Sequence, residues 1–171
     1  MKRMCKVEKE LPQRKHPRLD CYDYSSDGYY FVTICTKNRR CLLSNVVGRG
    51  LAPAEKEVEY TKLGKIAEQQ LHLLEKRYSC IKIDRYVIMP NHIHAVFIIA
   101  STAAGASPRP TLTDIVCAYK SLTTKECRKV GFSEKLFQTS FYEHIIRGQD
   151  DYDEIIKYIC DNPSQWYYDK L

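Results

Sequence analysis

The chain has 171 residues, of which 44% are hydrophobic and 28% are charged, and its formal net charge is +6 at pH 7. A chain of this length and composition folds most simply as one globular domain that buries its own core. No apolar run reaches the roughly 18 residues of a membrane-spanning helix, and the basic N-terminus lacks the apolar stretch of a secretory signal. We therefore expect a cytoplasmic protein that makes no membrane contact.

The eight cysteines are many for a chain of this length. No two of them form a Cys-X-X-Cys pair, which argues against a structural zinc knuckle. Several fall inside expected strands and helices, where a free cysteine packs as a small hydrophobic residue. We expect reduced thiols, with an extracellular disulfide scaffold as the alternative.

The positive charge is concentrated at the start of the chain. Residues 1–18 hold seven Lys or Arg against two Glu, a net charge of +5, which leaves +1 for the rest. Residues 1–20 also contain two prolines and show no helical or strand periodicity. We interpret 1–20 as a basic arm ahead of a single domain at 21–171. Such an arm suits a polyanion, and a solvated tail is the alternative.

Three strands and one helix are expected in the first part of the domain. Residues 29–36 are β-branched and aromatic, which predicts a strand. Residues 44–59 contain glycine and proline and predict a loop. Apolar residues recur at three- and four-residue spacing over 60–77, which predicts a helix. The apolar runs at 81–88 and 92–99 predict two further strands.

The second part of the domain repeats this alternation. Residues 101–110 are small and proline-containing, which predicts a connector, and 112–129 show the period of a helix. Residues 140–147 predict a fourth strand, and 151–161 predict a last helix that Pro163 ends. The order βαββαβ followed by a helix predicts the α+β class and a ferredoxin-like antiparallel sheet. The two earlier helices then cover one face of the sheet and leave the other face for a site.

The most informative stretch is residues 89–99, Met-Pro-Asn-His-Ile-His-Ala-Val-Phe-Ile-Ile. Alternate side chains of a strand share a face, so His92 and His94 project together with Cα atoms roughly 6.6 Å apart. Two imidazoles at that spacing are able to bind one divalent metal ion. The alternative is a pair of strand histidines that face solvent.

The last helix carries two stripes at 100° per residue. Its apolar stripe is formed by Tyr152, Ile155, Ile156 and Ile159. A polar stripe roughly 110° away includes Tyr158 and, one turn later, Asn162. A phenol and an amide oxygen therefore point the same way from this helix, although a tyrosine at the edge of the core is the alternative.

Together the two features suggest phosphoryl chemistry. Two imidazoles and one amide oxygen are a neutral ligand set, which leaves the full charge of a metal ion for an anion such as a phosphate diester. A nearby tyrosine is able to attack that phosphorus once its phenol, with a pKa near 10, is helped to lose its proton. The absence of a carboxylate beside His92 and His94 argues against the facial triad of iron oxygenases.

At these residues the chain resembles a known family. Pro90-Asn91-His92-Ile93-His94 is similar to the His-hydrophobic-His (HUH) signature of single-tyrosine transposases. Other stretches resemble the branch called REP-associated tyrosine transposases, which act at repetitive extragenic palindromes, and the likeness runs from about residue 14 to residue 169. These stretches are Tyr22-Asp23-Tyr24, Tyr30-Phe31-Val32-Thr33-Ile34-Cys35-Thr36, Tyr119-Lys120-Ser121, Tyr142-Glu143-His144-Ile145-Ile146-Arg147 and Tyr158-Ile159-Cys160-Asp161-Asn162-Pro163.

The resemblance implies a metal-dependent enzyme that cleaves and rejoins single-stranded DNA beside hairpins. In that family two histidines and a polar residue one turn after the tyrosine hold Mg²⁺ or Mn²⁺, which places His92, His94 and Asn162 as metal ligands. The tyrosine, here Tyr158, attacks the scissile phosphate and forms a 5′-phosphotyrosine. Mg²⁺ prefers oxygen ligands, so Mn²⁺ is at least as suitable for two imidazoles. Both a monomer and a homodimer fit the family.

Further DNA contacts are expected from basic residues. Arg14, Lys15 and Arg18 are placed along hairpin phosphates, where they give salt-sensitive affinity. Lys120 is expected to face the strand being cut, and Arg147 lies on the strand before the tyrosine helix. The alternative for each is a solvated surface charge.

Two other functions stay open at this point. One is a non-catalytic module of ferredoxin-like fold that binds single-stranded nucleic acid. The other is a phosphodiesterase in which water attacks and Tyr158 is structural.

Overall fold

The computed structural model describes residues 22–48, 56–100 and 109–166. The expected arm at 1–20, with Arg14, Lys15 and Arg18, lies outside the described residues. Along the chain the elements are β1 (Gly28–Cys35), a short 3-10 helix η1 (Lys37–Arg39), β2 (Ser44–Gly48), β3 (Lys56–Tyr60), α1 (Lys62–Arg77), β4 (Ile81–Ile88), β5 (His92–Ile99), α2 (Leu112–Lys129), β6 (Tyr142–Ile146) and α3 (Gln149–Gln165).

Four strands form one antiparallel sheet in the order β4-β5-β1-β6, and β2 pairs with β3 in a separate hairpin. The strands of the main sheet alternate with α1 and α2 as β1, α1, β4, β5, α2, β6. The expected α+β class and ferredoxin-like order are therefore confirmed. β4, β5 and α2 have the predicted bounds, whereas β1, α1 and β6 shift by one or two residues at one or both ends.

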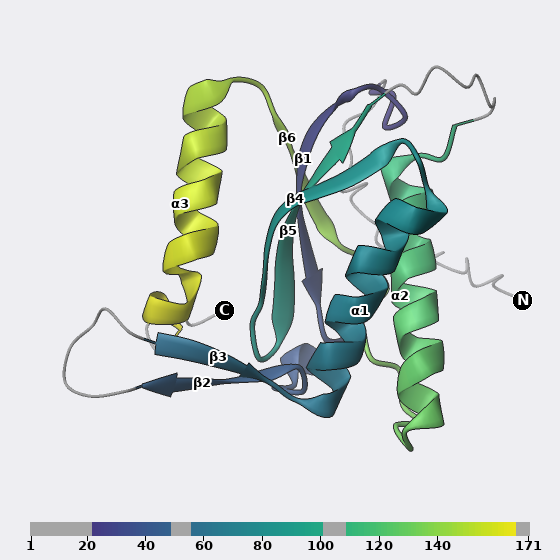
Figure 1. The fold of residues 1–171 in the computed structure, drawn as a ribbon, viewed down its shortest axis with the longest axis vertical. Coiled ribbons are helices and arrows are strands. Elements are labelled where there is room, and N and C mark those ends of the chain that lie inside the picture. Colours follow the sequence, from purple (N-terminus) through teal and green to yellow (C-terminus); the bar gives the residue numbers. More distant parts are fainter. Residues whose placement is uncertain (1–21, 49–55, 101–108, 167–171) are drawn as a thin grey trace, which may run out of the picture.

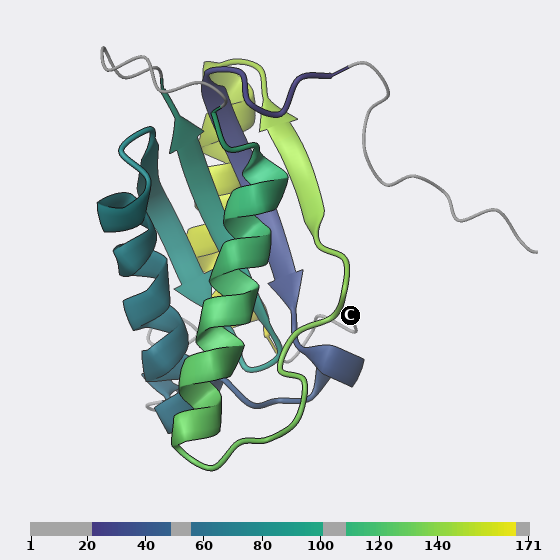
Figure 2. The same ribbon diagram turned by 90° about the vertical axis from the view of Figure 1, so that its right-hand side faces the viewer.

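The sheet separates two layers of helices. Figure 1 shows α1 and α2 side by side on one face of the sheet and α3 on the opposite face, and Figure 2 shows the first pair from in front. The face that the two earlier helices leave open is therefore covered by the last helix. Any site on that face lies between the sheet and α3.

Side chains of β5 divide between the two layers because neighbours along a strand alternate. Ile93 and Phe97 are fully buried in the main core, against α1 and α2. Val96 belongs to a smaller cluster under α3, and His92 and His94 share its face. Full burial of an aliphatic or aromatic side chain is worth about 1.5–3 kcal/mol, so β5 anchors the fold from both sides.

The expectation of a loop at 44–59 was wrong. Val46 stands opposite Val58 in the β2–β3 hairpin, and the buried Val46 packs in the cluster under α3. Each strand has only five residues, which is too short for an alternating pattern to stand out against the glycines and the proline in this stretch.

The predicted end of the last helix was also wrong. α3 continues through Pro163 to Gln165, and it begins at Gln149 after Gly148 rather than at residue 151. Proline in a helix removes one backbone hydrogen bond and costs about 3 kcal/mol. The two buried residues of α3, Ile159 and Asn162, both lie within the turn before Pro163 and hold the helix against the sheet.

The start of α1 is fixed by two features of its first turn. The Thr61 side chain caps the helix by accepting from the Gly64 amide at 3.1 Å. Gly64 lies so close to the preceding segment that a Cβ atom there would come 1.9 Å from the Leu43 carbonyl oxygen. Only glycine allows this approach of helix and backbone.

The expectations about membrane spans and cysteines can be compared with the described residues. Within these residues no helix is long and apolar enough to span a membrane. The six cysteines in the described ranges are all free thiols, as expected, and Cys5 and Cys21 lie outside those ranges.

Candidate active site

The paired histidines are buried. Their ring centroids lie 4.4 Å apart at the start of β5, and the residues are only 1% (His92) and 3% (His94) exposed. Strand histidines that face solvent, the alternative considered from the sequence, do not describe this pair. Buried polar side chains need a defined set of partners, so the surroundings of each ring decide its chemistry.

Both rings are held through their Nδ1 atoms. His92 Nδ1 lies 2.6 Å from Asn91 Oδ1, and because an amide oxygen only accepts, Nδ1 carries the proton. His94 Nδ1 lies 2.8 Å from Thr33 Oγ1, which is able to accept in the same way. With the protons on Nδ1, each Nε2 atom carries the lone pair. This is the arrangement in which protein histidines bind metal ions.

The electrostatics keep His94 neutral. Burial, and to a smaller extent the neighbouring His92, lower the pKa of His94 to about 3. A neutral imidazole is the form that binds a metal ion or accepts a proton, so His94 is ready for either role near neutral pH.

Tyr158 of α3 reaches this pair. Its hydroxyl lies 3.4 Å from His94 Nε2, and the two ring centroids are 5.1 Å apart. Phe31 of β1 stacks on His94 at 5.2 Å and meets the Tyr158 ring edge-on at 6.1 Å. Tyr158 is nevertheless 40% exposed, so solvent and a bound molecule are able to reach its side chain.

Asn162 follows Tyr158 by one helical turn and is only 2% exposed. A further turn along, the Trp166 ring lies 6.1 Å from the His92 ring. Because Tyr158 contacts His94 and Trp166 approaches His92, Asn162 occupies the stretch of α3 between these two contacts. The same face of the helix therefore presents a phenol and an amide to the imidazole pair.

The Asn162 amide has an unusual environment. Neither its oxygen nor its nitrogen has a hydrogen-bond partner within the described chain, although both are buried. An unsatisfied buried polar group costs about 1–3 kcal/mol, so such a group in a folded protein points to a ligand. An amide oxygen on the helix face that contacts the two imidazoles fits a divalent metal ion that accepts mixed nitrogen and oxygen ligands.

Within the described part of the chain, the candidate site has no cluster of the side chains that most often bind metal ions. The described ranges contain no group of three or more His, Cys, Asp or Glu side chains that could hold a metal ion. A metal ion at this site would therefore depend on the two imidazoles, the amide and oxygen atoms from solvent or substrate. Few charged ligands leave the positive charge of the ion available for a phosphate.

Two expected DNA contacts lie away from the imidazole pair. Lys120 is on α2, across the sheet from α3, and its Nζ donates to the carbonyl oxygens of Thr139 at 2.7 Å and Ser140 at 3.3 Å. Arg147 follows β6, and its backbone amide donates to Asp151 Oδ2 at 3.1 Å in the first turn of α3.

The first turn of α3 is tied to β6 by a second contact. His144 Nε2 lies 2.9 Å from both carboxylate oxygens of Asp151. The hydrogen bond with His144 and the one from the Arg147 amide hold the pKa of the Asp151 carboxyl below its ordinary value. These contacts fix the direction in which α3 leaves the sheet, and so they help to position Tyr158.

Sequence reasoning missed the residues that hold the pair. Thr33 and Phe31 belong to β1, and Thr33 stands opposite His94 only because of the β1–β5 register. Asn91 is adjacent to His92 in sequence, and an amide beside a candidate ligand was a signal that could have been used. Trp166 lies beyond Pro163, where the helix was expected to have ended.

Comparisons with known proteins find a relative by sequence and a solved structure with a similar fold. No family model matches the sequence. An uncharacterized protein of Haemophilus influenzae is 31% identical over 176 residues, which cover 94% of each chain. A solved structure of a REP-associated tyrosine transposase bound to a REP hairpin matches with a TM-score of 0.63 and 19% identity, over 90% of this chain and 76% of that chain. The match to that structure shows a common fold.

Proposed function

Because the chain belongs to one family with the Haemophilus influenzae protein and has the fold of a REP-associated tyrosine transposase, we propose that it cleaves and rejoins single-stranded DNA. Tyr158 is the proposed nucleophile, and His92, His94 and Asn162 are the proposed metal ligands. The observation that carries this proposal is the Tyr158 hydroxyl, 3.4 Å from Nε2 of a buried, neutral imidazole.

The covalent step follows from the chemistry of a phenol. The Tyr158 oxygen forms a bond to the scissile phosphorus, and the bond from phosphorus to the 3′ oxygen breaks. The phenol proton passes to solvent, which reaches this partly exposed side chain, and the departing 3′ oxygen takes up a proton. The products are a 5′-phosphotyrosine and a free 3′-hydroxyl. One phosphoester replaces another, so the reverse reaction joins strands without an external energy source.

Each neighbouring residue has a role in holding this geometry. Thr33 and Asn91 fix the two ring orientations through Nδ1, so that both Nε2 lone pairs stay directed away from the strand. Phe31 packs against both the His94 ring and the Tyr158 ring and limits where the phenol ring can lie. When bound at the two imidazoles and the amide, Mg²⁺ or Mn²⁺ supplies Lewis-acid stabilisation of the phosphate charge.

The proposed substrate is DNA with a hairpin beside the cleavage position. The structure that shares this fold is of a transposase bound to a REP hairpin, which supports a hairpin partner for this chain. The overall charge of +6 favours a polyanion in general. The arm at 1–20, with Arg14, Lys15 and Arg18, is proposed to add phosphate contacts.

A single assay tests the nucleophile. Labelled hairpin oligonucleotides with randomised single-stranded flanks are incubated with the protein and Mn²⁺ and analysed on denaturing gels. We expect a covalent protein–DNA adduct that is lost in Tyr158→Phe, since the phenol oxygen is the attacking atom. Tyr142→Phe is the matched control because Tyr142 is a more exposed tyrosine, at 61%, that lies on β6.

The same assay separates the alternatives. Cleavage that survives Tyr158→Phe without an adduct identifies a phosphodiesterase that uses water. Binding without any cleavage identifies a non-catalytic module. His92→Ala is expected to abolish cleavage and to spare hairpin binding, because the ring is placed for a metal ion and not for the stem. An equal loss of binding and cleavage in His92→Ala would instead assign the histidine a role in folding.

A further inference from the structure

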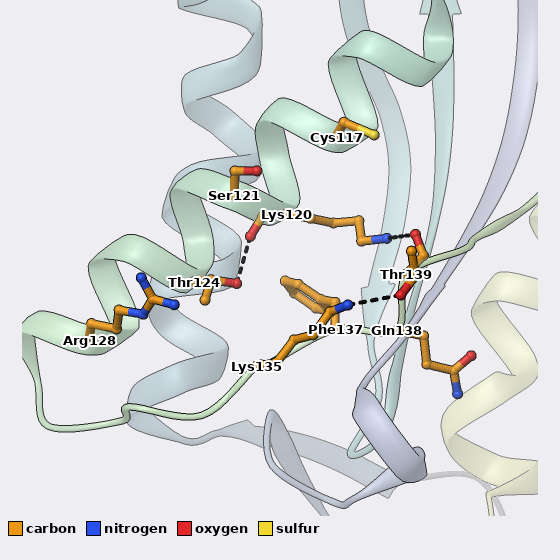
Figure 3. Close-up of a pocket in the computed structure, with 9 residues that line it drawn as sticks. All are labelled: Cys117, Lys120, Ser121, Thr124, Arg128, Lys135, Phe137, Gln138 and Thr139. Atoms are coloured by element: carbon orange, nitrogen blue, oxygen red, sulfur yellow. Dashed lines mark hydrogen bonds between the residues drawn. The ribbon is translucent and has the colours of Figure 1, made fainter.

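A hollow lined by several basic side chains lies on the side of the sheet that faces away from Tyr158. It is a groove of about 490 Å³ between α2 and the segment 135–139 that leads toward β6. Figure 3 shows the side chains of α2 and of this segment facing each other across it. The residues that line it are Cys117, Lys120, Ser121, Thr124, Arg128, Lys135, Phe137, Gln138 and Thr139.

The groove is strongly basic. Lys120, Arg128 and Lys135 line it, and none of the other lining residues is Asp or Glu. Lys135 Nζ donates to Thr139 Oγ1 at 2.8 Å, and Lys120 Nζ donates to two backbone carbonyl oxygens. The acceptor of Lys135 is a neutral hydroxyl, which orients its ammonium group without cancelling its charge. Arg128 has no carboxylate partner in the described part of the chain.

Nearby acidic residues are engaged elsewhere. Glu126 of α2 pairs with Lys129, and Glu134 pairs with Arg40. The Thr124 hydroxyl donates to the Lys120 carbonyl at 2.7 Å, and the other polar side chains that line the groove, at Ser121, Gln138 and Thr139, are hydroxyls and an amide. Hydroxyl and amide groups donate hydrogen bonds to phosphate oxygens in nucleic-acid complexes. The lining therefore has the charge and the donors that a phosphate requires.

The basic surface continues past this groove. A smaller hollow of about 250 Å³ shares Lys135, Gln138 and Thr139 with it and adds Lys37 and Asn38 of η1. The segment 135–139 thus stands between two hollows that both carry lysine. An extended polyanion suits two adjoining basic hollows better than a single small anion does.

The groove lies at the same end of the sheet as the imidazole pair. Phe137 forms a bridge with Thr36, and the Gln138 amide donates to the Cys35 carbonyl at 2.9 Å. Cys35 in turn stands opposite His92 in the β1–β5 ladder. The groove segment is therefore two strand spacings, roughly 10 Å, from β5 across the sheet.

We propose that this groove binds the phosphate backbone of the nucleic acid beside the cleavage position, while the scissile phosphate lies on the other face at Tyr158. This inference rests on the proposed function, because it assigns to the same DNA a second contact around the edge of the sheet. It also gives Lys120 a role different from facing the cut strand. The backbone in the groove comes either from the hairpin stem or from the single-stranded flank.

The test measures binding without metal ions, so that catalysis does not enter. Arg128→Ala with Lys135→Ala is compared with the wild type by fluorescence anisotropy in EDTA over a range of salt concentrations. The matched control is Lys62→Ala with Lys65→Ala, which removes two exposed charges from α1 outside the groove. One probe is a blunt hairpin without flanks, and the other is an unstructured single strand of mixed sequence.

We expect the groove variant to raise Kd about tenfold and to reduce the slope of log K against log salt by about 0.7–0.9 for each lost phosphate contact. The control is expected to stay near the wild type. A change with the blunt hairpin assigns the groove to the stem, and a change with the single strand alone assigns it to the flank. Wild-type affinity and slope for both probes would overturn the proposal.

This outcome is separable from that of the proposed function. If the groove variant binds DNA weakly and the wild type forms no adduct through Tyr158, the groove remains a nucleic-acid site and the catalytic assignment is wrong. If the groove variant binds DNA like the wild type and the wild type does form the adduct, the groove proposal is wrong and the catalytic assignment stands.

Discussion

The two faces of the central sheet treat buried polar groups differently. On the face covered by α1 and α2, the Tyr119 hydroxyl donates to the Ala67 carbonyl at 3.1 Å and the Thr123 hydroxyl donates to the Tyr119 carbonyl at 2.8 Å. On the face covered by α3, the Asn162 amide has no partner within the described ranges, and Tyr158 is partly exposed.

The difference shows where stability and function are placed. A buried polar group that is satisfied inside the protein supports the fold, whereas one that is left unsatisfied costs stability until a ligand binds. The α1 and α2 face therefore holds the domain together. The α3 face brings the Tyr158 hydroxyl to His94 and leaves the Asn162 amide buried without a partner in the described ranges, at some expense in stability.

The largest expected effect is the loss of a large side chain from the main core. Phe97→Ala is expected to lower the free energy of unfolding by about 3–5 kcal/mol, because it leaves a cavity under α1 and α2. Ile155→Ala, on the side of α3 that faces the sheet, is expected to lower the free energy of unfolding by about 1–2 kcal/mol, because Ile155 is only half-buried. Urea denaturation of both variants measures the difference. Equal losses would contradict the contrast between the two faces.

A substitution at the start of α1 is expected to have the next largest effect. Gly64→Ala places a Cβ atom against the Leu43 carbonyl oxygen, so the helix or the preceding backbone must move, at a cost of about 3 kcal/mol. Gly148→Ala is the matched control, since a Cβ atom there meets nothing within 4 Å and the backbone is extended. Thermal unfolding of the pair, with Gly148→Ala within about 1 kcal/mol of the wild type, checks this assignment.

A smaller effect of opposite sign is expected at Asn162. Asn162→Leu is expected to raise stability in EDTA by about 1 kcal/mol, because it removes a buried amide that lacks a partner. We also expect Mn²⁺ to raise the melting temperature of the wild type and Asn162→Leu to abolish that rise.

Asn162→Asp is the control for this prediction because it keeps an oxygen ligand. We expect it to preserve the Mn²⁺ response. A marked loss of stability of Asn162→Leu in EDTA would show instead that the amide supports the fold.

The smallest expected effect compares two tyrosines. Tyr158→Phe is expected to change the free energy of unfolding by less than about 0.5 kcal/mol, because the residue is 40% exposed and its contact with His94 is long, at 3.4 Å. Tyr119→Phe is expected to cost about 1 kcal/mol, since it removes a buried hydrogen bond from the Tyr119 hydroxyl to the Ala67 carbonyl. Chemical denaturation of the two variants compares them, and a larger loss for Tyr158→Phe would make that residue structural.

Local patterns predicted the parts of the molecule that depend on local sequence. The apolar run at 92–99 predicted the strand β5, and the geometry of a strand predicted the shared direction of His92 and His94. The helical period predicted α2 at its observed bounds. The β2–β3 hairpin was missed because two five-residue strands leave no lasting period. Elements of that length depend on tertiary packing more than on their own pattern.

The environment of the site depends on contacts that are distant in sequence. Thr33 holds His94 across 61 positions of the chain through the strand register, which no local pattern specifies. Asn162 lies on the polar stripe of α3 and was not expected to be buried, because burial there depends on how α3 crosses the sheet. The groove beside α2 was likewise hidden, since Lys135 and Arg128 come together only in the fold.

The central claim is that the Tyr158 oxygen is the atom that becomes joined to DNA. Trypsin cleavage after Lys157 releases a peptide that begins at Tyr158, so tandem mass spectrometry of protein treated with hairpin oligonucleotides and Mn²⁺ can locate the attached nucleotide. We predict a phosphonucleotide on Tyr158 in the wild type and none in His92→Ala. A nucleotide mapped to any other residue, or DNA cleavage with Tyr158 unmodified, would contradict the account.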